Sequence, residues 1–156
     1  KKLLGVDLPQ EVNNVKGKPD GIHILCLGPN EWLVVTPQGD ENKFHTQLTQ
    51  GLAELHVAIS LTGEARTTIR LSGLYARDTL AKGCPLDLHP RAFEPGQCAQ
   101  TLLARASMPL HQIYADNVTL SSTYDIIVLR SYAEYIWTWL EDAAQEYGLK
   151  VANIVK

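Results

Sequence analysis

The chain has 156 residues, of which 45% are hydrophobic and 20% charged, as in a globular domain of ordinary size. Its 14 basic and 17 acidic residues give a net charge of −3, which excludes the strongly basic character of a general nucleic-acid binder. No apolar run approaches the roughly 20 residues that cross a bilayer, so we predict no membrane span. The three cysteines are an odd number without a Cys-x-x-Cys pair, which predicts reduced thiols and a cytoplasmic location.

The first part of the chain is expected to form a hairpin followed by a helix. Residues 22–27 and 32–36 are strand-like and flank the turn signal Gly28-Pro29-Asn30. Asp40 can cap a helix over residues 41–56, in which Phe44, Leu48 and Leu52 recur at helical spacing. Residues 56–61 predict a further strand. Residues 1–5 resemble the end of a helix stopped by glycine, so we expect further residues upstream.

The second part is expected to contain strands at 67–71, 98–103, 109–114 and 124–129. A helix capped by Ser72 should run to Gly83, and a proline-punctuated loop should follow it. Ser131 and Glu134 match a capping box, which predicts that the last helix begins there. Its apolar stripe is expected to comprise Tyr132, Tyr135, Ile136, Trp139, Leu140, Ala143 and Tyr147, with Trp137 at the margin.

This order of elements predicts an α+β fold with mixed or antiparallel sheets and packed helices. Ferredoxin-like or split β-α-β halves are the arrangement we expect. The chain is interpreted as one domain of two interlocked halves, residues 1–62 and 63–156.

The search for chemistry finds no motif that assigns a catalytic, cofactor or metal residue. There is no glycine-rich phosphate loop. Cys84, His89 and Cys98 could converge on a metal, but their spacing matches no standard zinc pattern, and packing residues are the alternative. No cysteine–histidine pair is distinguished as a nucleophile and its base.

Two features remain open to more than one interpretation. The loop from Asp87 to Arg91 could bind a ligand, contact a partner or simply hold its own local structure. Trp137, outside the main stripe of the last helix, could be additional core or a partner contact, where tryptophan is enriched.

Several segments resemble the gamma subunit of heterotetrameric sarcosine oxidase. The most specific is Ala-Lys-Gly-Cys-Pro-Leu-Asp-Leu-His-Pro-Arg-Ala-Phe at residues 81–93, within a similar run that begins at Arg66. Residues 27–33, 95–103 and 131–140 stand in the family's order. The resemblance implies a fold similar to the folate-binding domains of aminomethyltransferases, preceded by an extra strand and helix.

The resemblance also implies a subunit without its own active site or cofactor. The complex would demethylate sarcosine to glycine, with hydrogen peroxide and methylene-tetrahydrofolate as products. FAD, FMN, NAD, tetrahydrofolate and zinc would belong to the alpha, beta and delta subunits. His89, Arg91, Phe93 and Trp137 are the predicted contact residues on this chain.

Two alternatives belong to other functional classes. One is a stand-alone folate-binding protein of one-carbon transfer, favoured by the aminomethyltransferase likeness. The carboxylate pair of the active relatives is missing from residues 106–111, which weighs against folate chemistry here. The other is a regulatory module that binds a small molecule at the Asp87–Arg91 loop.

Overall fold

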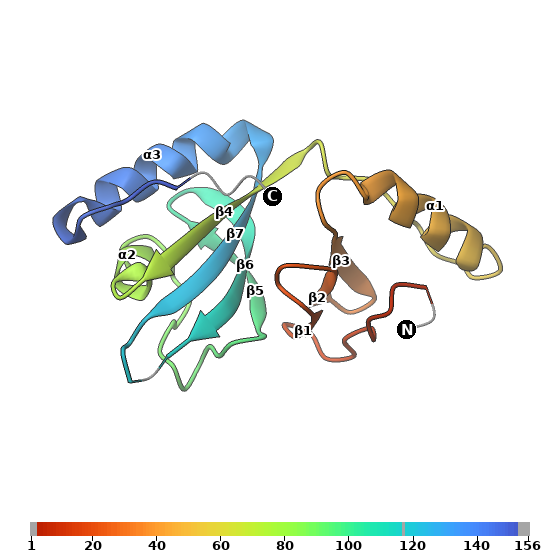
Figure 1. The fold of residues 1–156 in the computed structure, drawn as a ribbon, viewed down its shortest axis with the longest axis horizontal. Coiled ribbons are helices and arrows are strands. Elements are labelled where there is room, and N and C mark those ends of the chain that lie inside the picture. The colour runs from red at the N-terminus through yellow and green to blue at the C-terminus, as the bar shows by residue number, and fades with distance from the viewer. Residues whose placement is uncertain (1–2, 117, 153–156) are drawn as a thin grey trace. The chain divides into compact units, whose positions relative to one another are not determined.

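The computed structural model describes residues 3–116 and 118–152. The chain divides into two compact units, Lys1–Glu64 and Ala65–Lys156, which are described separately below (Figure 1). Each unit has its own antiparallel sheet and at least one helix.

The first unit is built on a three-stranded meander. Strands β1 (Val15–Gly17), β2 (His23–Gly28) and β3 (Glu31–Val35) lie in that order, and helix α1 (Glu41–Gly51) follows. The predicted hairpin is therefore confirmed. Asn30 occupies its turn with a φ of 61°, a left-handed conformation that asparagine tolerates. The short edge strand β1 was not predicted, since three residues carry too little pattern to reveal a strand.

Helix α1 ends earlier than predicted, and the strand expected at residues 56–61 is absent from the part of the chain that the structure describes. Leu52 donates the last helical bond to Leu48, after which the chain leaves the helix. The apolar side chains that suggested a strand are present but largely exposed, because no described strand pairs with them. The exposed ones are Val57 (53%) and Leu61 (49%), and Leu55, which lies within the range of the predicted helix, is also exposed (60%).

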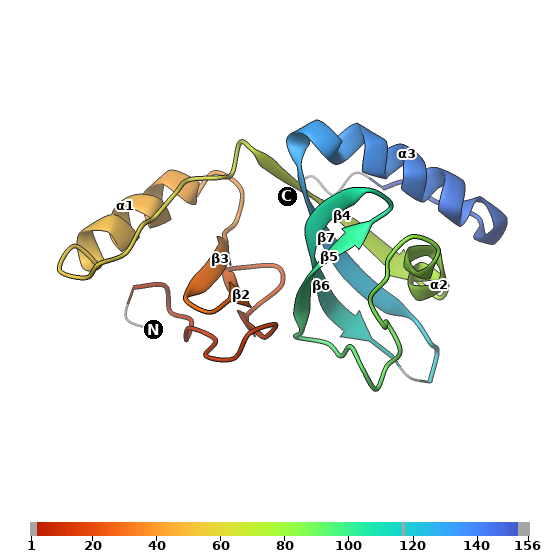
Figure 2. The same cartoon turned by 180° about the vertical axis from the view of Figure 1, so that it is seen from behind.

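The second unit contains a four-stranded antiparallel sheet. Its strands are β4 (Arg66–Gly73), β5 (Cys98–Leu103), β6 (Ala106–Ala115) and β7 (Ser122–Leu129), in the spatial order β4-β7-β6-β5. Figure 2 shows β5 and β6 side by side. Helix α2 (Ala76–Ala81) follows β4, and helix α3 (Ala133–Ala144) follows β7 between the 3-10 turns η1 (Arg130–Tyr132) and η2 (Gln145–Tyr147).

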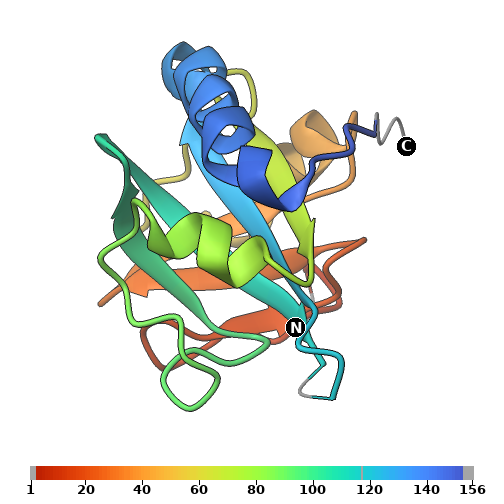
Figure 3. The same cartoon turned by 90° about the vertical axis from the view of Figure 1, so that its left-hand side faces the viewer.

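Both helices of this unit cover the same face of the sheet, as Figure 3 shows. Alternate residues of β6 and β7 point toward them because side chains of a strand alternate between faces. The resulting core includes Leu80 of α2, Ile136 and Leu140 of α3, and Met108, Leu110, Tyr124, Ile126 and Val128 of the strands.

The predicted α+β class with antiparallel sheets is confirmed. In detail, the second unit does not form split β-α-β halves. Strands β4 and β5 lie at opposite edges and run antiparallel, whereas a β-α-β unit joins parallel strands. The long irregular connection after α2 carries the chain to the far edge in reversed direction, and sequence periodicity does not encode where such a connection ends.

Helix α3 begins differently from the capping-box prediction. The turn η1 precedes it, and the N-cap position falls on Tyr132 without a side-chain capping bond. Ile136, Leu140 and Ala143 are buried as the stripe predicted. Tyr132 and Tyr135 are each 43% exposed, so the apolar stripe is narrower than expected.

Candidate functional site

The loop between α2 and β5 holds three of the four predicted contact residues. Its polar groups bond within the loop. Asp87 Oδ1 accepts a hydrogen bond from the amide of His89 at 2.9 Å, and His89 Nδ1 accepts one from the amide of Arg91 at 3.2 Å. His89 and Arg91 are exposed. The loop therefore presents these two side chains from a turn that Asp87 and His89 themselves stabilise.

Phe93, in contrast, is not a surface residue. Its side chain is 4% exposed and belongs to the core of the second unit, and its amide bonds to the carbonyl of His89 at 3.0 Å. The partner contact of Phe93 stays a prediction, although this burial places its ring in the core rather than on the surface of the chain. An aromatic residue after a proline-rich loop can anchor that loop to the core, and the sequence alone does not separate an anchor from a contact.

The suggested metal group is not assembled. Cys84 and Cys98 are buried free thiols, whereas His89 is exposed, and these three side chains do not come within a common ligand distance. Cys84 Sγ lies 3.6 Å from Thr101 Oγ1, a contact that places this thiol in the core beside β5. The packing interpretation of Cys84 is therefore the one that the geometry supports.

Lys82 joins the loop to the end of α3, a role that was not predicted. Its ammonium donates hydrogen bonds to the carbonyl of Ala143 and to the carboxylate of Glu146. It also lies 4.6 Å from the ring centre of Tyr147, which stacks on Tyr75 at a centroid distance of 4.6 Å. A cation at the carboxyl end of a helix satisfies its last carbonyls and its dipole.

The charges of this cluster stabilise one another. The hydrogen bond from Lys82 lowers the pKa of Glu146, and the same bond raises the pKa of Lys82. Desolvation is the main cause that raises the pKa of the Tyr147 phenol. All three groups therefore keep their ordinary protonation states at neutral pH, and the cluster acts as a structural clamp rather than as an acid–base pair.

A row of polar side chains crosses the sheet of the second unit on the face opposite its helices. Register places Arg70 beside Asp125, Asp125 beside His111 and His111 beside Cys98. Arg70 donates two hydrogen bonds to Asp125, from Nε to Oδ1 at 2.7 Å and from a second guanidinium nitrogen to Oδ2 at 2.9 Å. Sequence reasoning missed the row, although an aspartate inside the apolar run of β7 was a visible signal.

The fourth predicted contact residue lies on the outer face of α3. Trp137 is 39% exposed, outside the buried stripe, as its marginal position in the sequence predicted. Glu134 and Glu141 lie three residues before it and four after it, so they share its side of the helix. Since α3 contains no lysine or arginine, this face is aromatic and acidic.

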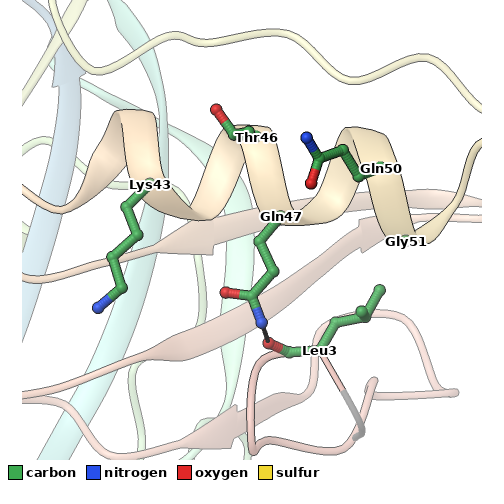
Figure 4. A pocket seen from close by; sticks show the side chains of 6 residues that line it. All are labelled: Leu3, Lys43, Thr46, Gln47, Gln50 and Gly51. Atoms are coloured by element: carbon green, nitrogen blue, oxygen red, sulfur yellow. Dashed lines mark hydrogen bonds between the residues drawn. The ribbon is translucent and has the colours of Figure 1, made fainter.

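A hollow of about 510 Å³ borders α1 in the first unit (Figure 4). The Gln47 amide donates a hydrogen bond to the carbonyl of Leu3, which fixes one wall, and the Thr46 hydroxyl is engaged by the carbonyl of Asn42 at 2.9 Å. Lys43 is the only charged residue in the lining. The hollow thus offers no acid–base or nucleophilic pair. Its lining is Leu3, Lys43, Thr46, Gln47, Gln50 and Gly51.

Comparison with known proteins identifies the group to which this arrangement belongs. A family model described as "Sarcosine oxidase, gamma subunit family" matches residues 1–146. The chain belongs to this family. The gamma subunit of sarcosine oxidase from Corynebacterium sp. (strain P-1) is 33% identical over 94% of this chain and 68% of the relative. The one from Arthrobacter sp. is 34% identical over 93% of this chain and 68% of the relative.

A solved structure supports the same relationship for this gamma subunit. It is heterotetrameric sarcosine oxidase from Corynebacterium sp. U-96 in complex with pyrrole 2-carboxylate, with a TM-score of 0.85 and 29% identity. The match covers 97% of this gamma subunit and 74% of that chain. The resemblance seen in the sequence segments is therefore confirmed. In the part of the chain that the structure describes, no helix has the length and apolarity needed to cross a bilayer.

Proposed function

We propose that this gamma subunit is a non-catalytic component of a heterotetrameric sarcosine oxidase and acts through contacts with the alpha, beta and delta subunits. The complex would oxidise sarcosine to glycine and form hydrogen peroxide and methylene-tetrahydrofolate. FAD, FMN, NAD, tetrahydrofolate and zinc would be held by the partner subunits. Family membership, together with the heterotetrameric relative of known structure, supports this proposal.

The observation that carries the contact role is the exposed face of α3. Trp137 projects a large apolar ring from a helix whose buried side is already filled by Ile136 and Leu140. Tryptophan is enriched among residues that contribute most to interfaces. The carboxylates of Glu134 and Glu141 beside it favour a partner surface that carries lysine or arginine.

A second exposed apolar region lies in the first unit. Helix α1 has no buried residue, although its sequence is amphipathic, and Leu55, Val57 and Leu61 are exposed in the segment that follows. An apolar surface of this kind is typical of a chain that completes its packing against another subunit. The buried free thiols of Cys26, Cys84 and Cys98 support a reducing compartment such as the cytoplasm.

Co-expression with alpha, beta and delta subunits tests the proposal. The tagged gamma subunit should co-purify with a yellow flavoprotein. Trp137→Ala should weaken this association about tenfold or more, and Glu134→Gln with Glu141→Gln should reduce its salt dependence. Trp137→Phe, which keeps an aromatic ring, and Tyr114→Ala, which removes an exposed ring outside α3, are the matched controls.

Three outcomes would contradict the proposal. The isolated chain could oxidise sarcosine, bind a flavin stoichiometrically, or bind tetrahydrofolate at micromolar concentration. The first two would place an active site on this chain, and the third would favour the folate-binding alternative. Loss of co-purification in Tyr114→Ala but not in Trp137→Ala would move the contact surface away from α3.

A further inference from the structure

Of the side-chain polar atoms that are buried without a hydrogen-bond partner among the described residues, four belong to three neighbouring residues of the second unit. They are Nε2 and Oε1 of Gln112, Oγ of Ser122 and the hydroxyl of Tyr124. All three residues are 0% exposed. Because native proteins satisfy the large majority of buried polar side-chain atoms, such a group calls for a specific explanation.

The three residues gather at one place on the sheet. Gln112 of β6 faces Tyr124 of β7 in register, and Ser122 lies two residues before Tyr124 on the same face. Side chains directly opposite each other in an antiparallel pair have Cβ atoms about 4.5–5.5 Å apart. The neighbouring pair on this face, Leu110 and Ile126, belongs to the core beneath the helices. The three residues therefore lie together at one end of this face of the sheet.

The backbone around Gln112 is irregular. The backbone carbonyl of Gln112 accepts a hydrogen bond from the backbone amide of Gly96 at 2.9 Å. The backbone amide of Gln112 donates one to the carbonyl of Gln97 at 3.0 Å. The pairing of β6 with β7 shifts by one residue between Gln112 and Tyr114. A bulge of this type bends the strand and interrupts the ladder, which opens space between side chains.

We propose that Gln112, Ser122 and Tyr124 bind at least one buried water molecule, which holds the bulged end of the sheet together. None of the three side chains is charged, so they suit an uncharged ligand such as water. A carboxamide and two hydroxyl groups offer both donors and acceptors, and a buried water commonly makes about three hydrogen bonds to such groups. The water would also fix Gln112, whose backbone anchors the turn before β5.

A high-resolution crystal structure of the full chain tests the site directly. We expect solvent density within about 2.7–3.2 Å of at least two of the four atoms. Direct hydrogen bonds among the three side chains, with no solvent between them, would overturn the proposal.

Urea unfolding of hydroxyl-deletion variants provides an independent test. Tyr124→Phe and Ser122→Ala should each raise the unfolding equilibrium constant about five- to tenfold, because each removes a partner of the shared water. Their combined effect should be less than the product of the two. Tyr114→Phe and Ser107→Ala, which remove exposed hydroxyls from β6, should leave the constant unchanged. Unchanged or increased stability in Tyr124→Phe and Ser122→Ala would mean that the atoms are unpaired, and would refute the water site.

Discussion

The indole of Trp139 lies directly on Gly83. A β-carbon built at Gly83 would stand 2.4 Å from Cζ2 of Trp139 and 3.2 Å from the amide nitrogen of Ala104. The carbonyl of Gly83 accepts a hydrogen bond from that same amide at 3.0 Å, so the backbone cannot retreat freely. Glycine at this position therefore allows α3, the loop after α2 and the turn between β5 and β6 to meet.

We expect Gly83→Ala to destabilise the chain by about 1–3 kcal/mol, the usual cost of inserting a methyl group into a filled space. The free energy of unfolding in urea is the measurement. Gly21→Ala, whose β-carbon would meet only Lys18 at 3.8 Å or more, should change it little. Trp139→Leu should lower the free energy of unfolding less in the Gly83→Ala background than in the unaltered chain, since the smaller side chain removes the clash. Equal costs in both backgrounds would show that the contact is not responsible.

The Lys82–Glu146 pair should make stability depend on pH at both extremes. Lys82 has a pKa raised above its ordinary 10.5, so its contribution is complete below 10.5 and is lost as pH rises through the higher value. Glu146 has a pKa lowered below its ordinary 4.5, so its contribution is present above 4.5 and is lost as pH falls through the lower value. Between these limits the pair contributes a constant amount.

Urea unfolding across the two pH windows checks this prediction. The free energy of unfolding should change with pH below about 4.5 and above about 10.5, partly because of this pair. Lys82→Met should remove that part of both changes. Lys150→Met, which removes an exposed lysine near the end of the chain, should leave both slopes as they are. Parallel stability curves for Lys82→Met and the unaltered chain would contradict the clamp.

The ion pair between Arg70 and Asp125 should respond unequally to the loss of its two partners. The Asp125 side chain is 4% exposed and that of Arg70 is 26% exposed. Arg70→Met leaves the carboxylate buried without its bidentate partner and should cost about 3 kcal/mol. Asp125→Asn leaves a guanidinium that can reach water and should cost less. The double variant Arg70→Met with Asp125→Leu should recover part of the loss, as replaced buried ion pairs often do. A cost below about 0.5 kcal/mol for Arg70→Met would be typical of an ordinary surface position and would refute the argument.

Local patterns in the sequence predicted most of the regular elements, because apolar periodicity and turn residues act over short distances. The hairpin around Asn30 and the strand at residues 98–103 were placed closely. The strand expected at residues 56–61 failed because a strand also needs a partner, and pairing is not a local property. The antiparallel placement of β4 and β5 at opposite edges of the sheet also depends on pairing between distant strands, so local patterns could not predict it.

The site residues show the same limit. The marginal position of Trp137 could be worked out from helical geometry, because exposure on a helix follows its period. The role of Lys82 could not, since its partners Ala143 and Glu146 lie more than 60 residues away in the chain. Phe93 was predicted as a contact residue from the family segment that it shares with His89 and Arg91, yet its ring belongs to the core.

That burial leads to a prediction that separates Phe93 from the two exposed residues of its loop. Phe93→Ala should destabilise the second unit by about 3–5 kcal/mol, since it removes a buried ring and leaves a cavity in the core cluster to which Phe93 belongs. His89→Ala and Arg91→Ala should each change the free energy of unfolding much less, because their side chains are exposed. Phe93→Leu, which fills part of the space, should fall between these values. If Phe93→Ala unfolded at the same urea concentration as Arg91→Ala, while only Phe93→Ala weakened association with the flavoprotein, Phe93 would be a partner contact after all.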